Sequence, residues 1–65
     1  MRLKVNGKER DVEGVQTVEE LIASLAIHRM IVVEQNGVIL RKEQFAETPL
    51  REGDVLEIVH MVGGG

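Results

Sequence analysis

Residues 1–5 alternate between apolar and basic side chains, in the order Met-Arg-Leu-Lys-Val. This period of two predicts a strand with one buried face. Asn6-Gly7 follows, and because a type I′ turn requires positive φ at both central positions, this dipeptide predicts a hairpin. The return strand, over residues 8–13, is mostly charged and is expected at a sheet edge. The turn predicts a register with two cross-strand pairs of opposite charge: Arg2 with Asp11, and Lys4 with Glu9.

A short amphipathic helix is predicted to begin after Thr17. The run Thr17-Val18-Glu19-Glu20 matches a capping box, in which the N-cap hydroxyl accepts from the Glu20 backbone and the Glu20 side chain reaches back. The apolar residues fall at positions i, i+3, i+4 and i+7, and so form one stripe along the helix: Val18, Leu21, Ile22 and Leu25.

Three further apolar segments predict strands. The β-branched run at 30–33 suits the centre of a sheet, and Asn36-Gly37 predicts a second hairpin into a short fourth strand. Residues 41–52 are expected to be irregular, with one helical turn. A turn at Glu52-Gly53-Asp54 then leads into the last strand, 55–62.

The element order is therefore β-β-α-β-β-β, and we expect residues 1–62 to form a single domain. For a chain of 65 residues, one helix packed on a mixed four- to five-stranded sheet is the smallest two-layer α+β arrangement. Order and size together predict the β-grasp, or ubiquitin-like, fold. The parallel pairing of the first and last strands rests on analogy with that fold.

The composition argues against several classes of protein. Phe45 is the only aromatic residue and the net charge is −3, so no basic face with stacking aromatics is expected and nucleic acid is not an expected partner. The absence of cysteine excludes thiolate metal sites, including those of the iron–sulfur ferredoxins that share the β-grasp fold. With no signal peptide and no apolar run long enough to span a membrane, we expect a cytoplasmic protein.

Few side chains offer chemistry. Ser24 lies within the predicted helix, and without Cys or Tyr no nucleophile–base pair can be assembled. His28 and His60 lie in different elements and lack metal-ligand spacing, so no metal site is expected. We therefore expect a carrier or binding protein rather than an enzyme.

The sequence ends in Gly63-Gly64-Gly65, directly after the last predicted strand. Glycines order poorly, so residues 63–65 suit a thin flexible tail that enters a narrow site in another protein. A linker remnant or a frayed end is the alternative. As a tail, Gly63 and Gly64 would give access and the Gly65 carboxylate would react. With a pKa of about 3.3–3.7 that carboxylate is an unreactive anion, which a partner enzyme must activate, most simply as an acyl-adenylate made from ATP.

The reach of the tail makes a docking surface necessary. Three glycines span at most about 10 Å, so the folded body must dock close to the partner's active site. Leu56 and Ile58 are expected to face the helix, which leaves Val59 and Met61 on the opposite face as an apolar patch of the kind that marks partner sites. Alternatively, residues 41–52 cover that face.

Several segments together carry a family resemblance: Val5-Asn6-Gly7, Thr17-Val18-Glu19-Glu20-Leu21, Gln35-Asn36-Gly37, the run from Leu50 to His60, and the final glycines. Over essentially its whole length the sequence resembles the ThiS family, the sulfur carriers of thiamine biosynthesis. The resemblance implies that a ThiF-like adenylyltransferase uses ATP to adenylate Gly65. Sulfur from a cysteine desulfurase or another sulfide source then leaves a thiocarboxylate (1-thioglycine), which the thiazole synthase ThiG consumes. No bound cofactor is implied.

Three other interpretations stay open. The small subunit of molybdopterin synthase uses the same tail chemistry on the same fold. A ubiquitin-like modifier would instead form isopeptide bonds with lysines. A non-catalytic β-grasp interaction domain would leave the tail idle.

Overall fold

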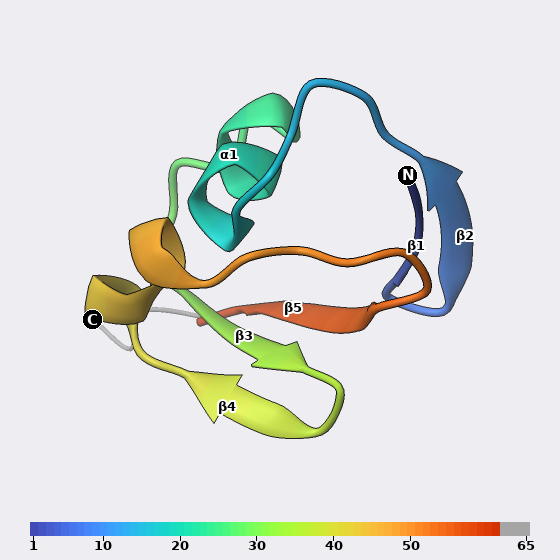
Figure 1. Ribbon diagram of the computed structural model, residues 1–65. Coiled ribbons are helices and arrows are strands. Elements are labelled where there is room, and N and C mark those ends of the chain that lie inside the picture. Colours follow the sequence, from blue (N-terminus) through green and yellow to red (C-terminus); the bar gives the residue numbers. More distant parts are fainter. Residues whose placement is uncertain (62–65) are drawn as a thin grey trace.

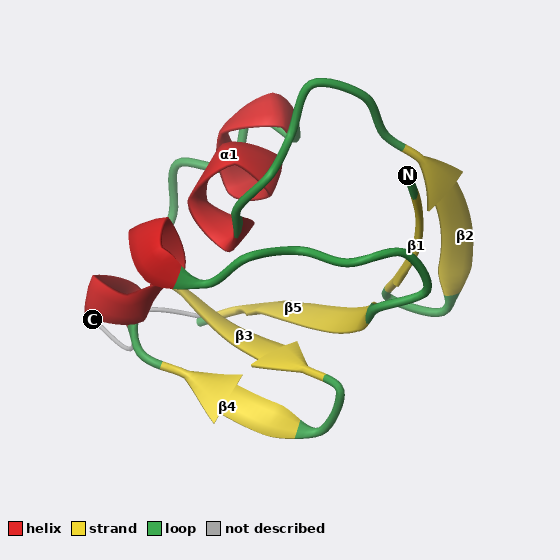
Figure 2. Ribbon diagram, in the orientation of Figure 1, coloured by secondary structure: helices red, strands yellow, loops and turns green. Residues whose placement is uncertain are grey.

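The computed structural model describes residues 1–61. The predicted tail, 63–65, lies outside the described residues, as does Val62. The elements in chain order are β1 (Arg2–Val5), β2 (Lys8–Asp11), α1 (Val18–Ser24), β3 (Ile31–Gln35), β4 (Val38–Leu40), the 3₁₀ helix η1 (Lys42–Glu47) and β5 (Val55–His60) (Figure 2). The predicted order is confirmed, and η1 occupies the segment where one helical turn was expected.

The five strands form one mixed sheet in the order β2-β1-β5-β3-β4. The last strand is central, parallel to β1 and antiparallel to β3. The parallel pairing expected by analogy is therefore present. In Figure 1, α1 lies over one face of the sheet, and β5 runs beneath α1 and ends beside η1.

The β1–β2 hairpin has the predicted register, with Arg2 opposite Asp11 and Lys4 opposite Glu9. The ion pair that forms is nevertheless diagonal, because Arg2 Nε contacts Glu9 Oε1 at 3.1 Å. Both side chains are largely exposed, so water screens this ion pair and it contributes little to stability. The turn, rather than charge pairing, sets the register.

The start of α1 differs from the predicted capping box in one bond. Thr17 Oγ1 accepts from the Glu20 N–H at 3.2 Å, as expected. The Glu20 carboxylate, however, accepts from the Gln16 N–H at 2.6 Å rather than from Thr17. Thr17 is itself in an isolated antiparallel bridge with Pro49, so a neighbouring segment lies against the backbone at this end of the helix.

That segment, part of 41–52, runs on the helix side of the sheet. The Val18 N–H donates to Thr48 O at 3.0 Å, and the Leu50 N–H donates to Gln16 O at 2.8 Å. The alternative that residues 41–52 cover the other face is therefore wrong. Backbone bonding to the start of α1 holds them on the side that the helix already occupies.

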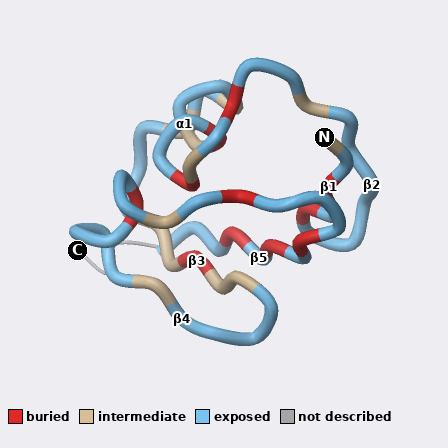
Figure 3. The backbone as a smooth tube through the Cα atoms, in the orientation of Figure 1, coloured by how far each residue is buried: buried red, intermediate tan, exposed pale blue. Residues whose placement is uncertain are grey.

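The core lies between this layer and one face of the sheet (Figure 3). Leu56 and Ile58 of β5 are buried, as their alternation predicts, and Phe45 is the buried residue of η1. The remaining buried apolar residues are Leu3, Val5, Val15, Val18, Leu21, Val33 and Leu50. The small core is almost entirely aliphatic.

Candidate functional site

The second face of the sheet carries no helix among residues 1–61, and it presents the end of β5. The predicted docking residues Val59 and Met61 lie there with 57% and 50% of their surface exposed. Ile39 of β4, opposite Glu34 of β3, is 64% exposed and extends this surface. Together we call Ile39, Val59 and Met61 the open-face patch. The sequence analysis missed Ile39, although the alternation that follows the Asn36-Gly37 turn carries the signal.

The patch lies beside the point where the described chain ends. The Met61 N–H donates to Met30 O at 3.0 Å, which continues the β3–β5 pairing past the last strand residue. The predicted reactive residue, Gly65, and its access residues Gly63 and Gly64 lie outside the described residues. Met61 is thus the last point at which the described chain is bonded to the sheet.

A groove of ≈800 Å³ lies on the helix side, also near this end of β5. Ile22, Ile27, Ile31 and Phe45 supply apolar lining. Met30, whose carbonyl bonds to Met61, lines the groove as well. Its polar lining residues are Glu19, His28, Arg29, Lys42 and Glu43. The groove and the open-face patch therefore flank the end of β5 from opposite sides of the sheet.

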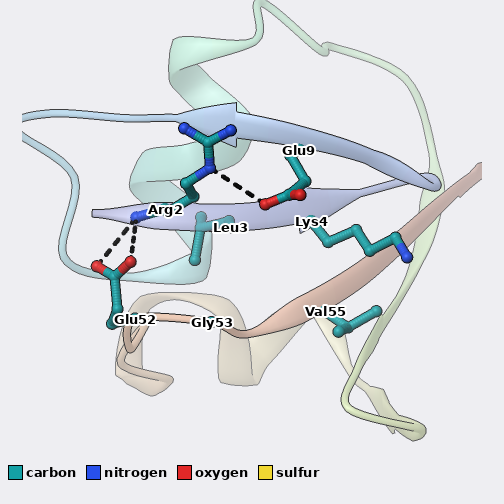
Figure 4. A pocket seen from close by; sticks show the side chains of 7 residues that line it. All are labelled: Arg2, Leu3, Lys4, Glu9, Glu52, Gly53 and Val55. Atoms are coloured by element: carbon teal, nitrogen blue, oxygen red, sulfur yellow. Dashed lines mark hydrogen bonds and ion pairs between the residues drawn. The ribbon is translucent and has the colours of Figure 1, made fainter.

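A second pocket, of ≈310 Å³, lies at the other end of β5 (Figure 4). Three of its polar residues are engaged with one another. Both Glu52 carboxylate oxygens accept from the Arg2 backbone N–H, at 3.0 and 3.1 Å, and the Arg2 guanidinium pairs with Glu9. Val55 lines this pocket and Met61 lies six residues on, a distance of about 20 Å at 3.3 Å per strand residue. The pocket is thus remote from Met61, where the described chain ends.

Among the described residues, Asp54 is the one charged residue that is buried. Its carboxylate accepts from Gln35 Nε2, Asn36 Nδ2 and the Arg51 N–H, at 3.0, 3.0 and 2.9 Å. Burial acts to raise the pKa of Asp54, but the hydrogen bonds from Asn36, Arg51 and Gln35 together outweigh burial and lower it. Asp54 therefore joins the β3–β4 turn to the start of β5, with its oxygens occupied by structural donors.

Two further observations bear on the kind of site. Residues 1–61 contain no group of three or more His, Asp or Glu side chains placed to hold a metal ion. No helix within the same range is long and apolar enough to cross a membrane.

Within residues 1–61, the α-helix α1 packs on a five-stranded mixed sheet, and the first strand, β1, runs parallel to the last, β5, in the middle of that sheet. This arrangement defines a small ubiquitin-like protein of the β-grasp fold. The crystal structure of the thiamine biosynthesis protein ThiS from Geobacter metallireducens confirms this fold, with a TM-score of 0.83 and 38% identity over all of both chains. The sequence model of the ThiS family matches residues 3–65, and the chain belongs to that family.

Two relatives differ in length. The sulfur carrier protein ThiS of Bacillus subtilis (strain 168) is 40% identical over 97% of this chain and 98% of that protein. A thiazole synthase of Paramagnetospirillum magneticum is 41% identical over the whole of this chain, which spans only 20% of that protein's length. The family resemblance predicted from the sequence is confirmed.

Proposed function

We propose that the protein is a sulfur carrier of thiamine biosynthesis and that the carboxylate of Gly65 carries the sulfur. The observation that supports this most directly is the ThiS family match over residues 3–65, together with full-length similarity to a protein named as a sulfur carrier. The chain itself acts as a co-substrate of partner enzymes, not as an enzyme.

The chemistry has two steps. A ThiF-like adenylyltransferase joins a Gly65 carboxylate oxygen to the α-phosphorus of ATP, and pyrophosphate leaves. Sulfide then attacks the acyl carbon, the carbon–oxygen bond to AMP breaks, and the thiocarboxylate is left on Gly65. Where a cysteine desulfurase supplies the sulfur as a persulfide, the same attack gives an acyl disulfide, and a thiol reductant must cleave its sulfur–sulfur bond to release the thiocarboxylate. Activation is needed because the carboxylate is an anion at neutral pH. ATP is consumed by the partner, and the carrier holds no cofactor.

The open-face patch is the proposed docking surface for the activating partner. Val59 and Met61 are exposed beside the last sheet bond of the described chain, between Met61 and Met30. From Met61 the four residues to Gly65 span at most about 14 Å. The body must therefore bind close to the nucleotide site, and exposed apolar surface beside Met61 is suited to that contact.

Thiazole synthase is the proposed acceptor of the sulfur. Support comes from the thiazole synthase of P. magneticum, of which one fifth is similar to this entire chain. We propose a cytoplasmic location for the carrier, because ATP, the ThiF-like adenylyltransferase and the thiazole synthase are all expected there.

Intact-mass spectrometry tests this function. The 65-residue chain, incubated with ATP, sulfide and the ThiF-like enzyme of the source organism, is expected to gain about 16 Da as one carboxyl oxygen is replaced by sulfur. A chain lacking Gly64 and Gly65 serves as the control. It should keep the wild-type melting temperature, since the core lies within residues 3–58, and should gain no mass.

Two results would contradict the proposal. An unchanged mass with an enzyme that demonstrably turns over ATP would exclude the carrier function. Conjugates on lysine residues, without the 16 Da gain that sulfur transfer predicts, would instead indicate a protein modifier.

Loss of the gene separates the two sulfur-carrier pathways. A requirement for thiamine would indicate the thiamine pathway, and a deficiency of molybdenum cofactor would indicate the molybdopterin pathway.

A further inference from the structure

Two glutamates face each other at the centre of the open sheet face. Glu34 of β3 is the direct cross-strand partner of Glu57 of β5. The neighbouring pair, Val33 and Ile58, is buried against the helix, so strand alternation places both carboxylates on the opposite face. Side chains that are directly opposite have Cβ atoms about 4.5–5.5 Å apart.

This arrangement is unfavourable in the isolated protein. Like charges directly opposite one another in a sheet destabilise it. Within residues 1–61 the recorded ion pair is Arg2 with Glu9, and neither Glu34 nor Glu57 has a basic partner. No ion pair among residues 1–61 therefore offsets the repulsion expected between these two carboxylates.

The two glutamates adjoin the open-face patch. Two residues along the strands, on the same face, Val59 is opposite Val32, and Ile39 of β4 is opposite Glu34 of β3. A partner that covers Val59 and Ile39 must therefore also cover the two carboxylates. Removing carboxylates from water is costly unless a positive charge replaces the lost hydration.

A second copy of this chain is a poor occupant of the face. A two-fold dimer brings the same patch of both subunits together, so Glu34 and Glu57 of one subunit would meet the same residues of the other. The chain also has a net charge of −3, which opposes self-association. The charge pattern instead favours a partner with basic side chains at the centre of an apolar surface.

We propose that the activating partner inserts an arginine or lysine side chain between Glu34 and Glu57, and that this contact selects the partner. The inference rests on the proposed function, because it assumes that the open face binds the adenylyltransferase. The carboxylate pair lowers the stability of the free carrier and strengthens the complex.

The double variant E34Q/E57Q tests the contact. It should bind the ThiF-like enzyme of the source organism at least about tenfold more weakly than wild type, as measured by calorimetry, and its affinity should depend less on ionic strength. E13Q/E47Q is the matched control, because it removes the same charge from two exposed positions away from the patch. The control should bind like wild type.

Folding is followed in the same variants. Because E34Q/E57Q relieves a repulsion, its Tm is expected to rise by about 1–6 °C, so weaker binding cannot be attributed to unfolding. Equal affinity of E34Q/E57Q and E13Q/E47Q would overturn the inference. So would a wild-type dimer in sedimentation equilibrium that Val59→Ser combined with Met61→Ser dissociates, because such a dimer would occupy the open face.

The 16 Da mass gain, measured at saturating enzyme, reports on the proposed function separately. A wild-type chain that gains no mass contradicts the carrier function itself. A wild-type chain that gains the mass, with an affinity unaffected by E34Q/E57Q, leaves the function standing and removes only the proposed cationic contact.

Discussion

Asn6 and Ile58 are joined by two hydrogen bonds that imitate a pair of strand residues. Asn6 Oδ1 accepts from the Ile58 N–H at 2.7 Å, and Asn6 Nδ2 donates to Ile58 O at 3.1 Å. Asn6 lies in the β1–β2 turn with a φ of 50°, where its own backbone has left the strand. Its side-chain amide therefore extends the parallel β1–β5 ladder by one position.

Replacing Asn6 by glycine is expected to destabilise the protein by about 1–3 kcal/mol, because glycine keeps the positive φ but leaves the main chain of Ile58 without both bonds. Urea unfolding measures the change. Lys8→Ala, at an exposed position of the same hairpin, should stay within about 0.5 kcal/mol of wild type. Equal stability of N6G and wild type would show that Asn6 serves only the turn.

The second asparagine–glycine turn repeats this device. The Asn36 N–H donates to Val55 O at 2.8 Å, and Asn36 Oδ1 accepts from the Val55 N–H at 2.9 Å. Each turn is thus bonded through its asparagine to the main chain of β5. The central strand is clamped from both neighbouring hairpins.

Asp54 should make stability depend on pH. Since the folded-state pKa of Asp54 is lowered, its contribution is complete above the unfolded-state value of about 3.9 and is lost as the pH falls through the folded-state pKa. Asp54→Asn is expected to be about 1–3 kcal/mol less stable than wild type at pH 7, because an amide cannot accept from all three donors. This difference should shrink below pH of about 3.9, as measured by urea unfolding. A difference that stays constant down to pH of about 2 would contradict the role of the carboxylate.

Ala26 ends α1 in a conformation that suits glycine. Its φ is 56°, and the bonds Ala26 N–H to Ala23 O and Ile27 N–H to Ile22 O form a Schellman motif. Ala26→Gly is expected to stabilise the protein by about 0.5–1 kcal/mol, because relief of the left-handed conformation exceeds the entropy cost of glycine.

Ala23→Gly is the matched control for this helix. The same substitution one turn earlier, at an exposed interior position of α1, should destabilise by about 0.5–1 kcal/mol. Thermal unfolding should therefore shift in opposite directions for the two variants. A shift of the same sign in both would contradict the assigned helix end.

Val59→Ser combined with Met61→Ser tests the docking patch. Because both side chains are exposed, the Tm should change little, but loss of their apolar contact should slow thiocarboxylate formation at low enzyme concentration by about tenfold or more. Val38→Ser is the control, since Val38 is 61% exposed but lies opposite Gln35, away from the patch. The docking role fails if the double variant and the control form product at the same rate.

Local patterns predicted much of this fold. The Asn6-Gly7 turn placed Arg2 opposite Asp11, and alternation in β5 identified Leu56 as core and Val59 as exposed. These predictions succeeded because turn geometry and strand period depend on neighbours within a few residues. The helix start at Thr17 was predicted for the same reason, while the partner of the Glu20 carboxylate, the Gln16 N–H, was not.

The sequence by itself determined the order of elements, the apolar faces of β1, α1 and β5, and the family to which the chain belongs. Only the tertiary structure decided that residues 41–52 lie on the helix side, that the open-face patch is uncovered, and that Glu34 meets Glu57. These features depend on contacts between segments that are distant in sequence. Such contacts are set by how the layers pack together, and a local sequence pattern does not predict that packing.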